Sequence, residues 1–194
     1  LTDTRLYAKL ADNTIIAGET NIDIPKTTAR APIKKVWLEP RADVNPEARQ
    51  AILEADGVVI GPGDLYTSII PNLLVRGIVP AIKKSKAKKI YVANLMTKRG
   101  ETEHLVARDF VAEIEKHVGR GVLNFAVFNR RRPAPEVIAR YRRMGSEFID
   151  PSGLDLKSAK PKFVLADLLG AGSFVRHDTR KKLAEVILSL LGSG

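Results

Sequence analysis

The spacing of apolar positions changes near residue 46, and the two parts of the chain predict different kinds of structure. Before that point, apolar and polar residues alternate loosely over residues 5–10 and 14–18, with a short turn-forming segment between them. Alternation with a period of two around such a segment predicts a β-hairpin. Residues 33–38 predict a further strand, which Pro40 ends because proline donates no hydrogen bond to a strand ladder.

After residue 46, helical spacing of apolar residues alternates with short apolar runs. Strands that alternate with helices are typical of parallel βαβ units with right-handed crossovers. We therefore expect an α/β fold, a Rossmann-like three-layer sandwich with a mostly parallel sheet plus a β-hairpin near the N-terminus, and a single domain over residues 1–194. The pattern predicts helices over residues 46–55, 69–84, 103–118, 135–144 and 178–191, and strands over residues 57–60, 89–96, 122–128 and 163–167.

Composition narrows the class of protein. The 194 residues include 32 Lys and Arg against 22 Asp and Glu, a formal charge of +10, and 44% are hydrophobic, which is typical of a globular chain. The absence of Cys excludes disulfides, thiolate metal sites and cysteine nucleophiles. No apolar run approaches the ~20 residues that span a bilayer, so we expect a cytoplasmic protein with no membrane partner.

The first candidate site is the loop that follows the strand at residues 57–60, because ligands of open α/β sheets bind at the carboxyl ends of the strands. Its glycines allow close backbone approach, and its hydroxyls lie where a helix begins, which favours a bound phosphate. An ordinary strand-to-helix turn capped by a hydroxyl is an equal alternative. The candidate residues are Gly61, Gly63, Asp64, Leu65, Thr67 and Ser68.

The second candidate site is the loop after the strand at residues 89–96. Asn94, Met96 and Thr97 are followed there by two cationic residues. Amide, hydroxyl and cationic groups together suit recognition of a polar ligand. The alternative, of equal weight, is an ordinary loop in which Thr102 caps the next helix and the cations are solvated.

Other charged clusters and the histidines carry weaker signals. Residues 130–132 and the basic positions of the helix at 135–144 predict a solvated face more than a phosphate site. His177 and the acidic residue after it resemble part of a charge-relay pair, but no serine lies in a G-x-S-x-G segment, so a capping or core histidine is favoured. His104 and His117 lie on one predicted helix at a spacing that suits no zinc site.

The basic charge raises the hypothesis of a nucleic-acid-binding domain, because residues 83–89 include five Lys. The aromatic residues number only 1 Trp, 4 Tyr and 6 Phe, and none lies within this run, so bases would find no stacking platform there. A soluble basic surface is the favoured interpretation, and nucleic acid is a disfavoured partner.

Several blocks of sequence together resemble the bacterial gluconeogenesis-factor (YvcK-type) family. They are GPGDLYTSIIPNLLV at residues 61–75, YVANLMT at 91–97 and GET at 100–102, extended by LTDT at 1–4, LEP at 38–40 and RHDT at 176–179. That family shares its fold with CofD, the 2-phospho-L-lactate transferase, so the resemblance implies a nucleotide pocket. The family begins with a first strand and a G-G-G-T-G loop, which this sequence lacks, so we expect it to correspond to the later part of the family's chain.

The resemblance also implies a function. Members of the family are understood as cytoplasmic proteins that bind UDP-sugars such as UDP-N-acetylglucosamine and influence cell shape, wall synthesis and growth on gluconeogenic carbon. By position, Tyr141 and Arg176 are similar to residues of the family's UDP-sugar site, and Thr179 to a threonine that is phosphorylated in some members. Where the family usually has Ser, this chain has Asp64, whose carboxylate would repel a bare phosphate unless Mg²⁺ or an Arg intervened, so a Mg²⁺ at Asp64 is left open.

Two alternatives stay open beside regulatory UDP-sugar binding. One is a transferase of the phospholactate type that acts on a nucleotide-activated phosphate donor with Mg²⁺, although no general base is evident. The other is the nucleic-acid-binding domain. The sequence also leaves open which UDP-sugar binds and whether a homodimer forms across an exposed sheet edge.

Overall fold

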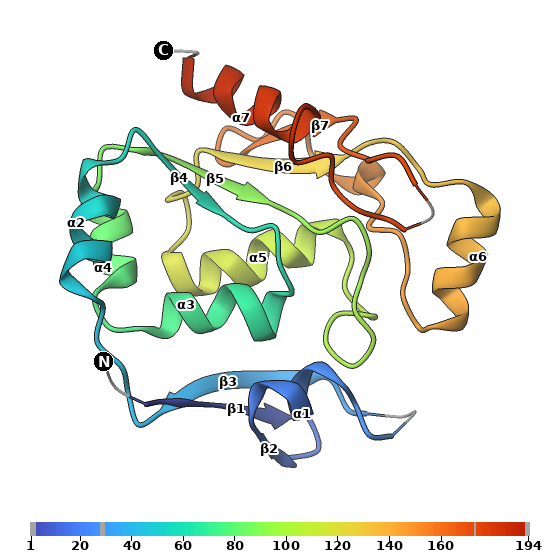
Figure 1. Ribbon diagram of the computed structural model, residues 1–194, viewed down its shortest axis with the longest axis horizontal. Coiled ribbons are helices and arrows are strands. Elements are labelled where there is room, and N and C mark those ends of the chain that lie inside the picture. Colours follow the sequence, from blue (N-terminus) through green and yellow to red (C-terminus); the bar gives the residue numbers. More distant parts are fainter. Residues whose placement is uncertain (1–2, 28–29, 173, 193–194) are drawn as a thin grey trace.

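Two β-sheets organise the chain in the computed structural model, which describes residues 3–27, 30–172 and 174–192 (Figure 1). The strands are β1 (Arg5–Leu10), β2 (Ile15–Ala17), β3 (Ile33–Glu39), β4 (Gly57–Ile60), β5 (Lys88–Val92), β6 (Phe125–Asn129) and β7 (Lys162–Ala166). The larger sheet is parallel with the order β4-β5-β6-β7, and the smaller is antiparallel with the order β2-β1-β3. Leu1 and Thr2 of the LTDT motif lie outside the described residues.

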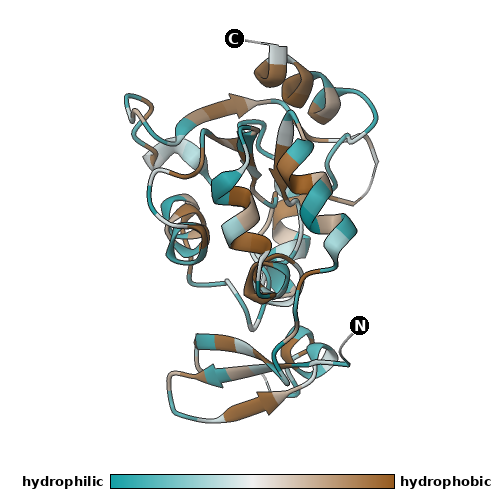
Figure 2. Cartoon of the chain, turned by 90° about the vertical axis from the view of Figure 1, so that its left-hand side faces the viewer, coloured by the Kyte–Doolittle hydropathy of each residue, from teal (hydrophilic) through white to brown (hydrophobic). Residues whose placement is uncertain are grey.

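Helices cover both faces of the parallel sheet. They are α1 (Glu19–Asp23), α2 (Pro46–Glu54), α3 (Ile70–Leu74), α4 (Ile78–Lys84), α5 (Ala107–Val118), α6 (Pro135–Arg143) and α7 (Lys182–Gly192), with a π-helical segment η1 (Leu65–Ile69) and a 3-10 turn η2 (Pro151–Gly153). Helix α7 lies on one face and α3, α4 and α5 on the other, with the antiparallel sheet as a further layer beyond them (Figures 1 and 2). The predicted α/β sandwich with an N-terminal hairpin is confirmed.

The single helix predicted over residues 69–84 is wrong, because η1, α3 and α4 replace it. Gly77 has a φ of +97°, a left-handed conformation that ends the helical path. Before it the chain is extended, and the Arg76 N–H donates to the Ala42 carbonyl while the Arg76 carbonyl accepts from the Val44 N–H, each over 2.9 Å. Since α3 and α4 both face the core, apolar periodicity continues across the break and hides it.

Four other predicted elements are too long, and one of them is the strand predicted over residues 122–128, which begins only at Phe125 as β6. Strand β5 ends at Val92 instead of residue 96, and helices α5 and α7 begin about one turn later than expected. A turn separates β5 from α5: the Lys98 N–H donates to Thr102 Oγ1 and the Thr102 N–H to the Lys98 carbonyl, each over 2.8 Å. The alternative in which Thr102 caps the next helix is therefore wrong, and the Asp109 carboxylate instead accepts from the Val106 N–H where α5 begins.

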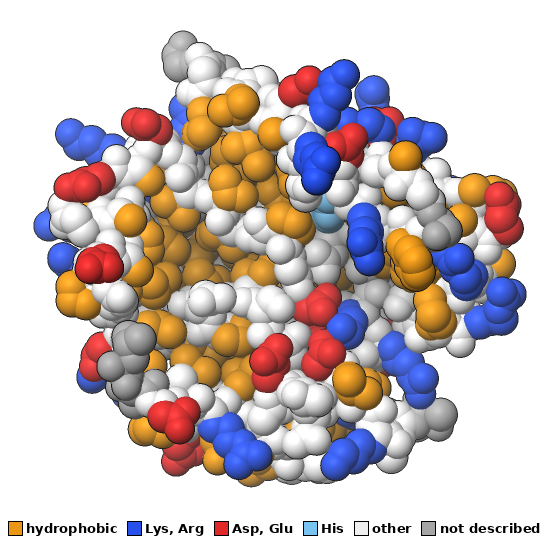
Figure 3. Space-filling model, in the orientation of Figure 1, with side chains coloured by type: hydrophobic (Ala, Val, Ile, Leu, Met, Phe, Trp, Pro, Cys, Tyr) orange, Lys and Arg blue, Asp and Glu red, His pale blue; other side chains and the backbone are white. Residues whose placement is uncertain are grey.

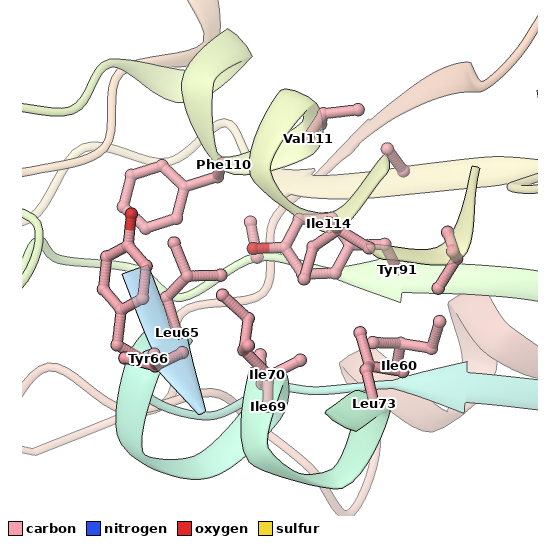
Figure 4. Close-up of a cluster of buried hydrophobic side chains, with 14 of the residues drawn as sticks. Ile60, Leu65, Tyr66, Ile69, Ile70, Leu73, Tyr91, Phe110, Val111 and Ile114 are labelled. Atoms are coloured by element: carbon pink, nitrogen blue, oxygen red, sulfur yellow. The ribbon is translucent and has the colours of Figure 1, made fainter. Parts of the chain in front are cut away.

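One hydrophobic core joins the parallel sheet, the helices on one of its faces and the antiparallel sheet. Figure 4 shows part of it, where Tyr91 of β5 lies among side chains of η1, α3 and α5. A second cluster on the other face joins Ile90 and Val92 to Leu183 of α7. Neighbouring residues of a strand point to opposite faces, so β5 supplies both clusters. The β5–α5 loop, which leaves this doubly buried strand, therefore starts from a fixed position.

Candidate functional site

A cavity of about 240 Å³ lies at the carboxyl ends of the parallel strands, where the α/β fold places its ligand sites. The loops after β4 and β5, the helix α6 and the segment between β7 and α7 form its walls. Figure 1 shows that the carboxyl ends of β4, β5 and β6 lie at the end of the sheet nearest α6. We call it the strand-end cavity, and its lining residues are Asp64, Asn94, Leu95, Met96, Thr97, Lys98, Tyr141, Ser146, Val175 and His177.

One wall of the strand-end cavity is a chain of polar contacts around Lys98. Its ammonium lies 2.9 Å from the Asp64 carboxylate and 2.6 Å from the Asp23 carboxylate. The Asn94 amide donates to the other oxygen of Asp64 over 3.2 Å. Burial lowers the pKa of Lys98, but the hydrogen bonds to Asp23 and Asp64 outweigh it and raise that pKa above its ordinary value. Lys98 is therefore a permanent cation whose charge two carboxylates share.

The Glu101 carboxylate lies at the start of η1, where the sequence predicted that a phosphate of a ligand would bind. Its buried carboxylate accepts hydrogen bonds from the Tyr66 N–H (3.1 Å) and from Thr67 Oγ1 (3.0 Å). Burial raises the pKa of Glu101 to about 7, against the effect of the hydrogen bond from Thr67, and the charge of Asp64 adds to the rise. The chain's own carboxylate thus takes the donors that a phosphate would need there.

The structure divides the predicted site residues between several places. The strand-end cavity brings together Asp64, Asn94, Met96, Thr97 and Tyr141. Gly61, Gly63 and Ser68 line a second, apolar cavity of about 410 Å³ beside β4, which Figure 3 shows as a hollow lined by hydrophobic side chains. Leu65 and Thr67 are buried. Arg176 and Thr179 are exposed on the segment between β7 and α7.

The acidic side chains beside the strand-end cavity partly suit a metal. Asp23, Asp64 and Glu101 each offer a carboxylate oxygen, and these oxygens lie within 4.8 Å of one another. Carboxylate oxygens are the ligands that Mg²⁺ prefers. However, the Lys98 ammonium already contacts two of the carboxylates, and the third accepts two internal hydrogen bonds. A cation would take over Asp23 and Asp64 only by displacing Lys98, and Mg²⁺ at Asp64 stays a prediction.

The opposite wall presents the aromatic ring of Tyr141, and two arginines that do not line the cavity lie near it. The Tyr141 hydroxyl accepts a hydrogen bond from the Val175 N–H over 3.0 Å. This contact fixes the Tyr141 ring, which α6 carries, against the segment between β7 and α7. The Arg140 guanidinium lies 5.6 Å from the centroid of the Tyr141 ring and 5.6 Å from that of Phe174. Arg176 lies 5.5 Å from the Phe174 ring. The cavity therefore has a surface for stacking in this wall, and positive charge lies beside it.

Thr97 has a structural role beside its place in the wall. Its hydroxyl accepts from the Glu147 N–H over 2.8 Å, and its own N–H donates to the Glu147 carbonyl over 2.7 Å. The neighbouring Met96 forms an isolated β-bridge with Phe148. These contacts hold the loop after β5 against the loop after α6, so they fix the distance between two walls of the cavity.

Sequence reasoning missed His177 as a residue of this site. The ring is half-buried and lines the strand-end cavity, with Nε2 lying 3.1 Å from the Ala93 carbonyl oxygen. The capping role belongs to Asp178, whose carboxylate accepts from the Lys181 N–H over 3.0 Å. One signal in the sequence could have indicated that His177 belongs to this site, namely its position. His177 follows the last strand of the parallel sheet, just as the other loops of the cavity follow the other strands.

The basic clusters are largely exposed, as a solvated face requires, although several of their side chains also make contacts within the fold. Lys88 donates to the Leu190 and Leu191 carbonyls over 2.9 and 3.1 Å, and Lys89 is buried, donating to the Ser85 carbonyl over 2.5 Å. Arg131 and Arg132 pair with Asp167 and Asp150 over 3.3 and 3.2 Å. Part of the lysine run predicted as a soluble basic surface is thus used to attach α7 and to end α4.

Within the described parts of the chain, no helix has the length and apolar character that crossing a bilayer requires. A family model described as "2-phospho-L-lactate transferase CofD" matches residues 1–169. A Thermotoga maritima protein named as a gluconeogenesis factor is 43% identical over 187 residues, which are 94% of this chain and 58% of that protein. The Bacillus subtilis gluconeogenesis factor is 36% identical over 96% of this chain and 58% of its own length.

A solved structure is similar over nearly the same share of this chain. The crystal structure of a UPF0052 family member from Bacillus halodurans superimposes with a TM-score of 0.87 at 35% identity, over 96% of this chain and 59% of that one. The chain therefore spans somewhat more than half the length of these proteins, and the α/β arrangement described above is shared with them.

Proposed function

Because the chain belongs to the CofD family, we propose that it is a cytoplasmic regulatory protein that binds a UDP-sugar such as UDP-N-acetylglucosamine in the strand-end cavity. The processes it would influence are growth on gluconeogenic carbon, cell-wall synthesis and cell shape. The observation that carries the proposal is the cavity, which joins an aromatic ring, the Lys98 ammonium and hydrogen-bonding groups at the carboxyl ends of parallel strands. Similarity to gluconeogenesis factors supports it.

Tyr141 and Arg176 are the residues that we propose to hold the UDP portion. The Tyr141 ring is fixed through its hydroxyl, so its face is pre-organised for a uracil ring. The Arg176 side chain is exposed beside Phe174 and, among the described residues, forms no ion pair. A free guanidinium can donate two parallel hydrogen bonds to a diphosphate.

Thermal unfolding with and without UDP-N-acetylglucosamine tests the proposal directly. A ligand at a hundred times its dissociation constant should add about 2.7 kcal/mol to the free energy of unfolding. Arg176→Ala should reduce this stabilisation strongly, whereas Arg49→Ala, an exposed arginine on α2, should leave it unchanged. No stabilisation of the wild-type chain by UDP-N-acetylglucosamine or UDP, with or without Mg²⁺, would refute UDP-sugar binding by this chain.

A second candidate function is a transferase of the phospholactate type. The description of the family model and the carboxylates of Asp23 and Asp64, which a divalent cation could share with a phosphorylated substrate, favour it. The test is incubation with a nucleotide-activated phosphate donor, an acceptor alcohol and Mg²⁺. Turnover that Asp64→Asn abolishes would support the transferase, and UDP-sugar binding without any turnover would leave the regulatory function.

A further inference from the structure

The hydrogen bond between His177 and Ala93 determines which nitrogen of the imidazole carries the proton. The Ala93 carbonyl oxygen, buried at the end of β5, can only accept, so Nε2 donates across the 3.1 Å contact. In a neutral imidazole the other nitrogen, Nδ1, then has a free lone pair and no proton. The backbone of β5 thus fixes His177 as a hydrogen-bond acceptor at Nδ1.

Nδ1 of His177 is available to a ligand. No described residue donates to it, and among the described side chains the only buried polar atom without a partner is Nε of Arg30. Nδ1 is therefore not sealed in the interior, and His177 is one of the residues that line the strand-end cavity. Burial lowers the pKa of His177, against the effect of the Ala93 hydrogen bond, so the ring is neutral near pH 7.

The groups around His177 favour a donor as its partner. Asp64 faces the same cavity as a carboxylate, and the nearby cation, Lys98, is already shared between Asp64 and Asp23. The diphosphate of a nucleotide-sugar carries no O–H group, so it would bring only acceptors to the two acceptors here. Hydroxyl and amide N–H groups, which sugars and acetylated amino sugars carry, satisfy an imidazole nitrogen and a carboxylate together.

We propose that Nδ1 of His177 accepts a hydrogen bond from a hydroxyl or N–H group of the ligand's sugar, and that this contact distinguishes a UDP-sugar from UDP. The inference rests on the proposed function, since it assigns the sugar to the Asp64 and His177 side of the cavity and the nucleotide to the Tyr141 side. His177 is in this view a specificity-determining residue.

A matched pair of substitutions separates the two nitrogens. His177→Gln keeps an amide donor that can reach the Ala93 carbonyl but places no acceptor at Nδ1, whereas His177→Asn places an amide oxygen near Nδ1 and gives up the Ala93 contact. By calorimetric titration we expect His177→Gln to bind UDP-N-acetylglucosamine about fivefold to tenfold more weakly, with unchanged affinity for UDP. His177→Asn should keep more of the preference for the sugar. His117→Gln, a histidine of α5 distant in the sequence from the cavity loops, is the control.

The outcomes distinguish the two proposals. If wild-type protein binds neither nucleotide, the proposed function fails and this inference with it. If it binds both and His177→Gln changes neither affinity, or lowers both equally, the inference is overturned while UDP-sugar binding stands. A measurement on the wild-type chain covers the case of unfolded variants: the ¹⁵N shift of His177 Nδ1 should move on addition of UDP-N-acetylglucosamine and not of UDP, and equal shifts would overturn the inference.

Discussion

Lys98 and Asp23 form an ion pair of 2.6 Å that joins the strand-end cavity to the antiparallel sheet. Asp23 is the last residue of α1, which follows β2, whereas Lys98 lies on the loop after β5. Arg30 makes a second connection, because its guanidinium donates to the carbonyls of Gly100 and Ile22. The loop after β5 is therefore attached to both sheets, and the antiparallel sheet helps to position a cation of the cavity.

Asp23→Asn should increase the affinity of the cavity for UDP. The substitution removes one of the two carboxylate charges that contact the Lys98 ammonium. At the high dielectric constant of a partly exposed site, loss of this charge should raise the affinity for an anion about threefold. The free energy of unfolding should fall by about 1 kcal/mol, since a partly exposed pair is lost. Glu19→Gln, which removes an exposed charge from the same helix, should change neither quantity. Weaker UDP binding by Asp23→Asn would instead mean that Asp23 holds Lys98 in the orientation that the ligand needs.

Glu101 should make the protein less stable as the pH rises through the weakly acidic range. Its pKa is raised from 4.5 to about 7 in the folded state, so the folded chain binds more protons than the unfolded chain between these values. The contribution of Glu101 to the free energy of unfolding therefore falls from pH 4.5 to about 7 and is constant above that. Glu101→Gln should remove this dependence and be the more stable protein at pH 8, by up to about 3 kcal/mol.

Urea unfolding of Glu101→Gln and wild type at pH 5, 6, 7 and 8 measures that difference. Glu103→Gln is the matched control, because Glu103 is exposed two residues away. If the free energies of unfolding of wild type and Glu101→Gln differ by the same amount at every pH in this range, the raised pKa of Glu101 is contradicted. Glu101→Ala should be less stable than Glu101→Gln at every pH, since it leaves the Tyr66 N–H and the Thr67 hydroxyl without their acceptor.

The parallel sheet could be predicted from sequence because its strands are short apolar runs such as Gly57–Ile60, which need no knowledge of their partners. The break at Gly77 could not, because apolar spacing on its two sides is continuous and only the φ of +97° reveals it. The helix α1 was also missed, since it has a single buried residue, Ile22, and hence no apolar face to detect.

The candidate site was predictable where position along a strand decides it. Asp64 and Asn94 come together because the carboxyl ends of neighbouring parallel strands meet at one edge of the sheet. The pairing of Glu101 with Thr67 depends on how the loop after β5 folds back, and no local pattern encodes that. The role of His177 depends on a backbone carbonyl, Ala93, which has no sequence signature at all.

Gly77→Ala should destabilise the chain more than the same substitution at another glycine in a left-handed conformation. A Cβ at Gly77 would lie 2.5 Å from Cγ1 of Val44, in addition to the strain of a φ of +97°. Gly121→Ala isolates the backbone strain, about 1–2 kcal/mol, because its φ is +73° and nothing lies within 4 Å of its Cβ. We expect Gly77→Ala to cost at least about 1 kcal/mol more in urea unfolding. Equal losses would show that Val44 moves aside freely.

A negative charge at Thr179 should weaken nucleotide binding. Thr179 is exposed in the turn before α7, between the exposed Arg176 and Arg180 in sequence. A phosphate or carboxylate there would compete with a diphosphate for these guanidinium groups. Thr179→Glu should therefore lower the affinity for UDP by about threefold to tenfold at low salt, and less at high salt because the interaction is screened. Thr179→Gln, which is the same size and neutral, should bind as the wild type does. If Thr179→Glu and Thr179→Gln weaken binding equally and independently of salt, the effect is steric, and phosphorylation of Thr179 would not regulate the cavity by charge.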